Sequence, residues 1–218
     1  MEQHILTMGN YRLACQLPQQ AVRQLVYFHS PVDDLTPPGD LLEQAGAAFL
    51  CITGEDWNAD LTPWPAERVF AKGGDFGGRA DRYLRVLTEE LLPFAEHSLH
   101  AEGLPRTLAG VSLSGLFAVY AAHRTDAFHR ICSVSGSLWY DGFLDFMVQN
   151  PVSPAVRRVY LSVGSREKNA KNPRMRRVED CTLRAVGRLR QQDVDTRMEI
   201  NPGGHYADGA ERLRKGLT

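Results

Sequence analysis

The feature that most constrains the fold is an alternation of short apolar runs with amphipathic stretches of helical length. The run Ala47 to Thr53 (AAFLCIT) is apolar almost throughout and has the length of a strand that is buried on both faces. In Ala80 to His97, by contrast, leucines and a tyrosine recur at helical spacing. Because strands that alternate with helices form a mainly parallel sheet covered on both faces, we expect an α/β fold.

The remaining elements are expected to continue this alternation over one domain. Strands are predicted at 11–17, 23–29, 106–111, 130–133, 157–163 and 196–200, and helices at 41–45, 113–123, 174–191 and around Arg212. The segment Gly54 to Gly78 is rich in Trp, Pro, Gly and Asp, and a loop of this length in a compact domain is usually functional. The length of 218 residues suits a single α/β domain over residues 1–218.

Composition excludes several classes of partner. The formal net charge of -1 gives no bulk electrostatic reason to bind nucleic acid or an acidic membrane surface. No apolar run approaches the roughly 20 residues that cross a bilayer, and no signal-like start opens the chain, so we expect a cytoplasmic protein. The four cysteines form no C-x-x-C pair, which argues against a structural zinc site and favours buried thiols in a reducing compartment. The sequence does not indicate the oligomeric state.

A serine lies at the junction of a predicted strand and a predicted helix, in the sequence GVSLSG at residues 110–115. Such a tight turn strains the backbone and pushes the serine hydroxyl out of the sheet, as in the nucleophile elbow of α/β hydrolases. Ser112 is therefore the candidate nucleophile, and the N–H of Leu113 is the candidate first donor of an oxyanion hole. Ser114 departs from G-x-S-x-G but is small enough for the turn to persist. The alternative is that Ser112 only caps the helix.

A serine needs a base to become nucleophilic, and in this fold the acid and then the histidine follow the serine along the chain. Of the seven histidines, only His205 lies in the loop after the last predicted strand, in NPGGHY. Glu167 follows the preceding strand and is the candidate acid that orients the imidazole. Asp180, Asp193 and Asp195 are weaker candidates for this acid. Alternatively, Ser112 and His205 act without an essential acid. No cluster of His, Asp and Glu has metal-ligand spacing, which disfavours a metal-dependent hydrolase.

The rest of the site is expected among the loops at the carboxyl ends of the strands. The second oxyanion donor should follow the predicted strand 23–29. Pro31 has no N–H, so the donor is Ser30 or Val32, and Ser30 is the preferred candidate.

Three tryptophans are expected to converge on the same edge and to form an aromatic substrate pocket, namely Trp57, Trp64 and Trp139. The alternative for each is packing in the core. A basic run, Arg166, Lys168, Lys171, Arg174, Arg176 and Arg177, either favours an anionic substrate or forms a solvated face.

Four blocks of the C-terminal half resemble the putative-esterase family of α/β hydrolases, which includes esterase D and enterochelin esterase. They are GVSLSGLFAVYA at the serine, SVSGSLWYDG at 133–142, VYLSVGSRE before the acid and PGGHYAD at the histidine. The resemblance implies hydrolysis of an ester or thioester without a cofactor. The chain departs from the family in Ser114 and in its short length, which leaves no room for a cap domain. Residues 56–78 resemble a small bacterial subgroup of uncharacterised hydrolases.

The leading hypothesis is therefore a serine esterase of the α/β-hydrolase fold that cleaves a small-molecule ester through an acyl-enzyme on Ser112. One alternative is an acyltransferase that uses the same residues but excludes water. A second is a binding protein of this fold without catalysis, in which Ser112 is a helix cap.

Overall fold

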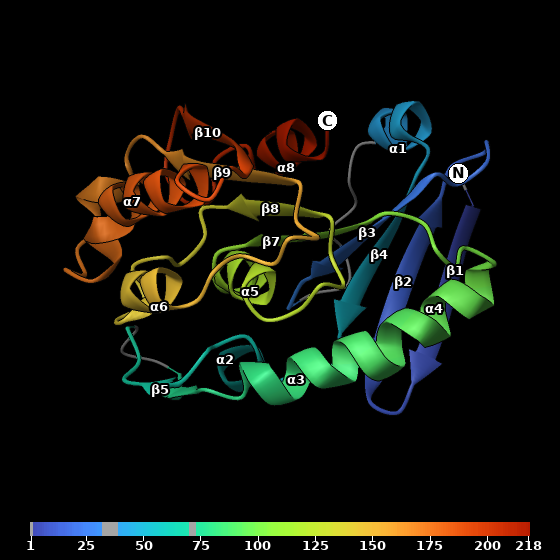
Figure 1. The fold of residues 1–218 in the computed structure, drawn as a ribbon, viewed down its shortest axis with the longest axis horizontal. Helices are drawn as coiled ribbons and strands as arrows, with labels where there is room; N and C mark the ends of the chain where they lie inside the picture. Colours follow the sequence, from blue (N-terminus) through green and yellow to red (C-terminus); the bar gives the residue numbers. More distant parts are fainter. Residues whose placement is uncertain (1, 32–38, 70–72) are drawn as a thin grey trace.

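The computed structural model in Figure 1 describes residues 2–31, 39–69 and 73–218, and its central feature is a large sheet. Within these ranges eight strands form the sheet in the order β1-β2-β4-β3-β7-β8-β9-β10. The strands are β1 (Glu2–Met8), β2 (Tyr11–Leu17), β3 (Gln24–His29), β4 (Ala47–Thr53), β7 (Arg106–Val111), β8 (Arg130–Val134), β9 (Arg158–Gly164) and β10 (Asp195–Asn201). The continuous apolar run becomes β4, which is buried over its first six residues.

Most neighbouring strands of the sheet run parallel. Strands β4, β3, β7, β8, β9 and β10 form parallel pairs, whereas β2 pairs antiparallel with both β1 and β4. The prediction of a mainly parallel sheet is confirmed. Strand β1 was not predicted, because an exposed edge strand needs no apolar run. The carboxyl ends of the parallel strands meet at one edge, and the loops that follow them build the candidate site.

Helices cover both faces of this sheet (Figure 1). On one face lie α3 (Ala80–Val86), α4 (Leu92–Leu99), α5 (Leu113–Ala122), α6 (Phe143–Gln149) and α7 (Val178–Arg190). On the other lie α1 (Gly39–Ala45) and α8 (Gly209–Leu217). Helices α3 and α4 form the long predicted helix, joined by the π-helical turn η1 (Leu87–Leu91). This turn ends two residues before Pro93, which has no N–H for a regular helical bond.

Two further helical regions differ from the predictions. The helix expected at 174–191 begins with a 3₁₀ turn, η3 (Met175–Arg177), and continues as α7. Helix α6 was not predicted, because it is short and begins after Gly142, a glycine with positive φ.

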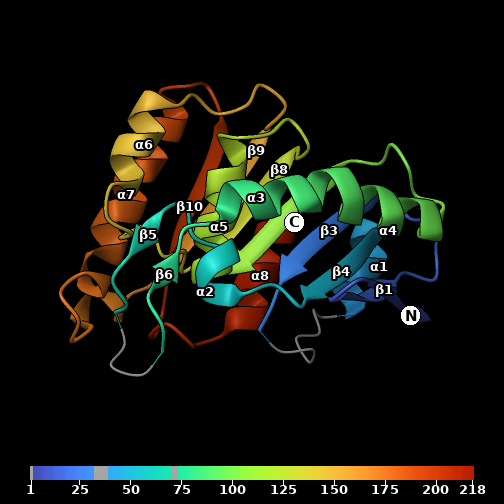
Figure 2. The same cartoon turned by 90° about the horizontal axis from the view of Figure 1, so that it is seen from below.

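The irregular segment after β4 contains short elements of its own. They are α2 (Trp57–Asp60) and a small two-stranded sheet of β5 (Pro65–Ala66) and β6 (Phe76–Gly77). Figure 2 shows these elements gathered beside the sheet, next to the end of α3. They form one wall of the candidate site.

The four cysteines are buried and free, as the sequence predicted for small apolar side chains. In the ranges that the structure describes, none of the helices combines the length and apolar character that a membrane crossing requires.

Candidate active site

Ser112 occupies a strained turn between β7 and α5. Its φ of 61° and ψ of -117° lie in a region that residues with a side chain rarely adopt. Its backbone N–H is nevertheless fixed by the carbonyl of Val134, at 3.0 Å. The Ser112 side chain makes no capping hydrogen bond to α5, which contradicts the alternative that this serine is a helix cap. Its hydroxyl lines a cavity instead.

The turn is tight enough to exclude larger side chains. A Cβ atom on Gly110 would lie 2.3 Å from the backbone carbon of Ser114. Ser114 itself is fully buried, and its hydroxyl donates to the carbonyl of Val111 and accepts from the Val111 N–H, each at 2.9 Å. The serine that replaces the usual glycine therefore ties the start of the helix to the end of the strand, and the elbow persists.

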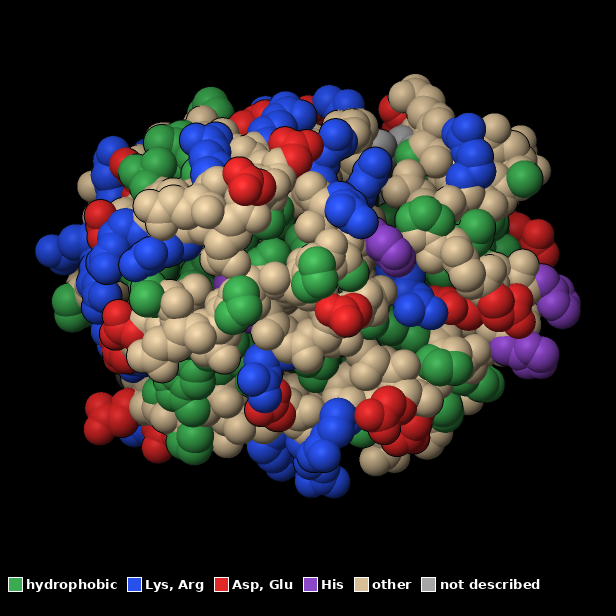
Figure 3. Space-filling view, viewed as in Figure 1, with side chains coloured by type: hydrophobic (Ala, Val, Ile, Leu, Met, Phe, Trp, Pro, Cys, Tyr) green, Lys and Arg blue, Asp and Glu red, His purple; other side chains and the backbone are tan. Residues whose placement is uncertain are grey.

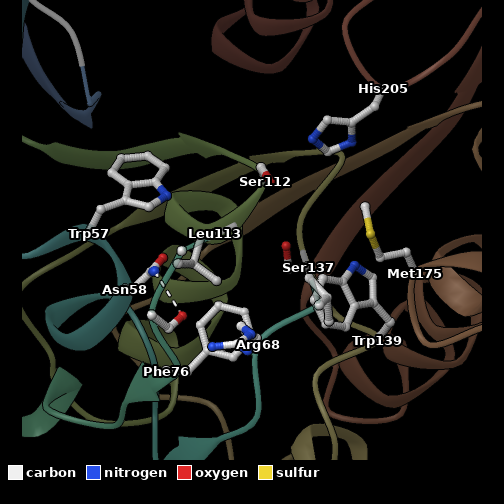
Figure 4. A pocket seen from close by; sticks show the side chains of 13 residues that line it. Trp57, Asn58, Arg68, Phe76, Ser112, Leu113, Ser137, Trp139, Met175 and His205 are labelled. Carbon is white, nitrogen blue, oxygen red and sulfur yellow. Dashed lines mark hydrogen bonds between the residues drawn. The ribbon is translucent and has the colours of Figure 1, made fainter. Parts of the chain in front are cut away.

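His205 faces Ser112 from the loop between β10 and α8 (Figure 4). Its Nδ1 lies 2.7 Å from Oε2 of Glu167. Since a carboxylate only accepts, Nδ1 carries the proton, and Nε2 is left to act as a base. The loop comes close to the end of β9, because a Cβ on Gly164 would lie 2.7 Å from the carbonyl oxygen of Gly203. Glycine at 164 thus allows the histidine loop to approach the acid.

Glu167 is buried, and its carboxylate accepts hydrogen bonds from His205, Ser135 and Gly164. Its Oε1 accepts from the hydroxyl of Ser135 at 2.5 Å and from the N–H of Gly164 at 2.6 Å. Burial by itself raises the pKa of this carboxyl, but the hydrogen bonds from His205, Ser135 and Gly164 outweigh it, so the pKa is lowered overall. Glu167 is therefore ionised at neutral pH.

Two residues behind Glu167 were not singled out from the sequence as part of the site. Arg212 on α8 is fully buried and donates through Nη2 to the hydroxyl of Ser135 at 2.6 Å, while the same Nη2 lies 3.7 Å from Oε1 of Glu167. Burial lowers the pKa of Arg212 and the charge of Glu167 raises it, with a lowered pKa as the result. Ser135 follows the carboxyl end of β8, so strand topology could have placed it, whereas nothing in the sequence marks Arg212 as buried.

Two cavities flank the serine, and they share Ser112, His205 and Trp57. The first is also lined by apolar side chains that include Leu113, Phe76, Trp139 and Met175. The second extends toward the end of β3 and the start of α8. A mainly apolar lining around a few polar groups is typical of a site for a small molecule.

The prediction that three tryptophans converge needs one correction. Trp57 and Trp139 line the first cavity from opposite sides (Figure 4), but Trp64 lines neither cavity. The Trp64 indole N–H donates to the carbonyl of Asp141 at 2.9 Å, and its ring packs against Tyr140 and Phe146. Trp64 instead ties the segment after β4 to the start of α6.

The two predicted oxyanion donors differ in whether their backbone N–H has a partner. Leu113 begins α5, so its N–H belongs to the first turn, where helical donors have no partner within the helix. The Ser30 N–H, by contrast, donates to the carbonyl of Ile52 at 3.3 Å, which continues the β3–β4 ladder and argues against the prediction that Ser30 is the second oxyanion donor. The alternative donor, Val32, lies outside the described residues.

The basic run lies beside the first cavity, and several of its charges are paired. Arg174 forms an ion pair with Asp141 at 2.9 Å and stacks 5.6 Å from the ring centre of Trp139. Lys168 pairs with Glu179 at 3.2 Å. Figure 3 shows Lys and Arg side chains gathered at the end of the molecule that carries α7. In the described part of the chain, no three His, Cys, Asp or Glu side chains are grouped as metal ligands would be.

The parallel sheet, the serine elbow and the histidine that faces it together define the α/β-hydrolase class. The model of the family described as "Putative esterase" matches residues 9–207. The chain therefore belongs to this family of carboxylic ester hydrolases.

Solved structures with the same fold include several esterases. An IroE-like serine hydrolase from Shewanella oneidensis is 18% identical, with a TM-score of 0.79 over 99% of this chain and 78% of that chain. The siderophore hydrolase EstA from Aspergillus nidulans is 17% identical, with a TM-score of 0.72 over 99% and 92%. The enterobactin esterase FES from Shigella flexneri is 19% identical, with a TM-score of 0.69 over 99% and 57%.

A sequence relative is the Bacillus subtilis (strain 168) protein described as "Uncharacterized protein YbbA". It is 33% identical over 111 residues, which are 50% of this chain and 44% of that protein. The similarity therefore spans less than half of that relative.

Proposed function

We propose that this protein is a serine esterase that hydrolyses a small-molecule carboxylic ester or thioester through an acyl-enzyme on Ser112. The observation that carries the proposal is the strained elbow that turns Ser112 toward His205, whose Nδ1 is held 2.7 Å from Glu167. This is the arrangement of nucleophile, base and orienting acid that serine hydrolases of unrelated folds share.

In the proposed acylation step, Ser112 Oγ bonds to the substrate carbonyl carbon while His205 Nε2 accepts the hydroxyl proton. The electron pair of the carbonyl double bond moves to oxygen, and the N–H of Leu113 donates to this oxyanion. The intermediate collapses as the bond to the leaving group breaks, and His205 returns the proton to the leaving alcohol or thiol. Water then attacks the acyl-enzyme with His205 as base, which releases the acid and restores Ser112.

Glu167 has a separate role in this proposal. Because its pKa is lowered, the carboxylate accepts the Nδ1 proton of His205 at neutral pH and fixes the useful tautomer. It also stabilises the imidazolium that forms when His205 takes the serine proton. The donors on Oε1 leave Oε2 for His205.

The lining of the first cavity supports a substrate with an apolar or aromatic group next to the scissile bond. Trp57, Trp139, Phe76 and Met175 provide this surface within reach of Ser112. Structural neighbours whose names include siderophore and enterobactin further support a small-molecule ester rather than a macromolecular substrate.

The first test is intact-mass measurement after treatment with a fluorophosphonate, on the wild type and on Ser112→Ala and His205→Ala. We expect one adduct on the wild type, none on S112A, and labelling of H205A slowed by at least about 10²-fold. A folded wild type that forms no adduct would remove the basis of the proposal. Product analysis with and without added alcohols then separates hydrolysis from acyl transfer.

A further inference from the structure

Trp57 lies where the two cavities beside the candidate nucleophile meet. It lines both cavities that flank the serine, a property that it shares only with Ser112 and His205 among the described residues. Figure 4 shows its indole nitrogen on the ring edge that faces Ser112, across the cavity from Trp139. In the part of the chain that the structure describes, this N–H has no protein acceptor. An indole N–H only donates, so it is suited to an oxygen of a bound molecule.

Hydrogen bonds and ion pairs fix both ends of the short helix that carries Trp57. Asp56 caps α2 by accepting from the N–H of Ala59. Arg79 bridges both ends of the helix, with Nη2 2.8 Å from Asp56 and Nε 3.0 Å from Asp60. Its own backbone N–H donates to the carbonyl of Ala59 at 2.7 Å. A donor on a fixed element loses little freedom when it binds a developing charge.

The topology places this donor on the side where an oxyanion hole needs one. Trp57 follows β4, and His205 follows β10, so the two residues approach Ser112 from opposite sides along the sheet order. The side of Trp57 is also the side of β3, from which the second donor usually comes in this fold. There, the Ser30 N–H is occupied by Ile52, Pro31 has no N–H, and Val32 lies outside the described residues.

We propose that the indole N–H of Trp57 donates a hydrogen bond to the oxyanion and acts with the Leu113 N–H as the oxyanion hole. The assignment rests on the proposed esterase function. When Ser112 Oγ bonds to the carbonyl carbon, the electron pair released from the carbonyl bond resides on the oxygen between these two donors. The indole keeps its proton throughout, and His205 remains the group that takes the serine proton.

The test compares three Trp→Phe variants, since the chain has three tryptophans in three different settings. We expect Trp57→Phe to lower kcat/KM for p-nitrophenyl acetate by about 10²-fold, the usual cost of removing one oxyanion donor, with KM changed less than about 3-fold. Inhibition by an aryl trifluoromethyl ketone, which forms an oxyanion hemiketal with the serine, should weaken by the same factor. Trp139→Phe should alter mainly KM, because Trp139 lines the cavity, and Trp64→Phe should leave both constants unchanged.

A second measurement does not depend on how the Trp57 variant folds. In the wild type, three indole N–H signals are expected in a ¹⁵N–¹H spectrum, and W64F and W139F assign them by elimination. Addition of the trifluoromethyl ketone should move the Trp57 signal downfield, as a charge-assisted hydrogen bond requires.

The outcomes separate the two proposals. An active wild type whose Trp57 signal does not move, or a folded W57F with kcat/KM within 3-fold of the wild type, overturns the role of Trp57 alone. A wild type that neither hydrolyses the ester nor binds the ketone overturns the esterase function together with it.

Discussion

Two buried glutamates lie at opposite edges of the same sheet, and they are satisfied in different ways. Glu96, on α4, lies near the amino end of β7, where Arg106 donates to both of its oxygens at 2.5 and 2.7 Å. The hydroxyl of Tyr27 adds a third bond at 2.9 Å. Glu167, after the carboxyl end of β9, receives neutral donors on Oε1 and His205 on Oε2. Its nearest arginine, Arg212, is held 3.7 Å away and bonds to Ser135 instead.

The comparison shows that a buried glutamate can stabilise the fold at one edge of the sheet and support the candidate active site at the other. A bidentate arginine uses the hydrogen-bonding capacity of Glu96 within the fold and fixes α4 against β7. At Glu167, neutral donors and a more distant cation keep the carboxylate charged while one oxygen remains for a histidine. The loops at the carboxyl edge of a parallel sheet form the binding site, so a carboxylate oxygen that remains for a histidine is useful there.

The largest effect that tests this comparison is on activity. We expect Glu167→Gln to lower kcat/KM for a p-nitrophenyl ester by about 10³-fold or more, because an amide cannot fix the imidazole tautomer or stabilise imidazolium. The matched change Glu96→Gln should leave kcat/KM within about 3-fold. If E167Q retained more than a tenth of the wild-type value, serine and histidine would act without this acid.

The reverse experiment targets stability. Glu96→Ala should lower the free energy of unfolding by about 3 kcal/mol, because it leaves Arg106 partly buried without its partner. The folded protein should retain its kcat. Urea denaturation measures the loss, and the double variant Glu96→Ala/Arg106→Met, which leaves no orphaned charge, should be less destabilised than E96A. Equal destabilisation of the two would show that the lost packing and the lost bond from Tyr27, and not the orphaned charge, matter.

A smaller effect is expected from removing one donor to Glu167. Ser135 has a φ of 48°, so Ser135→Gly keeps the backbone relaxed while it removes the hydroxyl. Since this hydroxyl lowers the pKa of Glu167, its loss raises that pKa, and activity should be lost at a higher pH on the acid side. We expect kcat/KM at neutral pH to fall about 10-fold.

The control is Ser162→Ala, which removes another contact of Arg212, at 3.4 Å, without touching Glu167. The pH profile of kcat/KM for S162A should overlay that of the wild type. A shifted profile in both variants would point to Arg212 rather than to the hydroxyl of Ser135.

The smallest effect concerns stability against pH. Because the pKa of Glu167 is lower in the folded protein than its ordinary value of 4.5, its ionised form stabilises the fold above that pH. This contribution is lost as the pH falls through the lowered pKa of the folded state. The difference in unfolding free energy between wild type and E167Q should therefore shrink between neutral pH and pH 3. A difference that is constant with pH would contradict the lowered pKa.

Much of the fold and part of the site could be predicted from local pattern. The bounds of β2, β4 and β7 agree with the predicted ones, because apolar runs of strand length specify buried strands. The turn motif at a strand end predicts Ser112, and chain order and strand ends predict Glu167 and His205. The structure places His205 beside both of the others. Residues that follow parallel strands can be predicted to lie close together, because the carboxyl ends of these strands share one edge of the sheet.

Other site features depend on contacts between distant segments. Trp57 and Trp64 lie seven positions apart in the same segment, yet only Trp57 lines the first cavity. Trp57 lies on α2 beside the cavity, whereas the indole N–H of Trp64 donates to the carbonyl of Asp141. The Ser30 N–H is lost to the β3–β4 ladder, which a one-dimensional pattern does not record.

The sequence by itself determined the parallel α/β framework, the serine elbow and the order of acid and histidine, because these follow from short-range periodicity and turn chemistry. Only the tertiary structure decided that Arg212 and Ser135 support Glu167, that Glu96 is matched by Arg106, and that Trp57 faces the serine. The physical reason is that a charge or a donor takes its role from what surrounds it. Those surroundings are assembled from residues that are far apart along the chain.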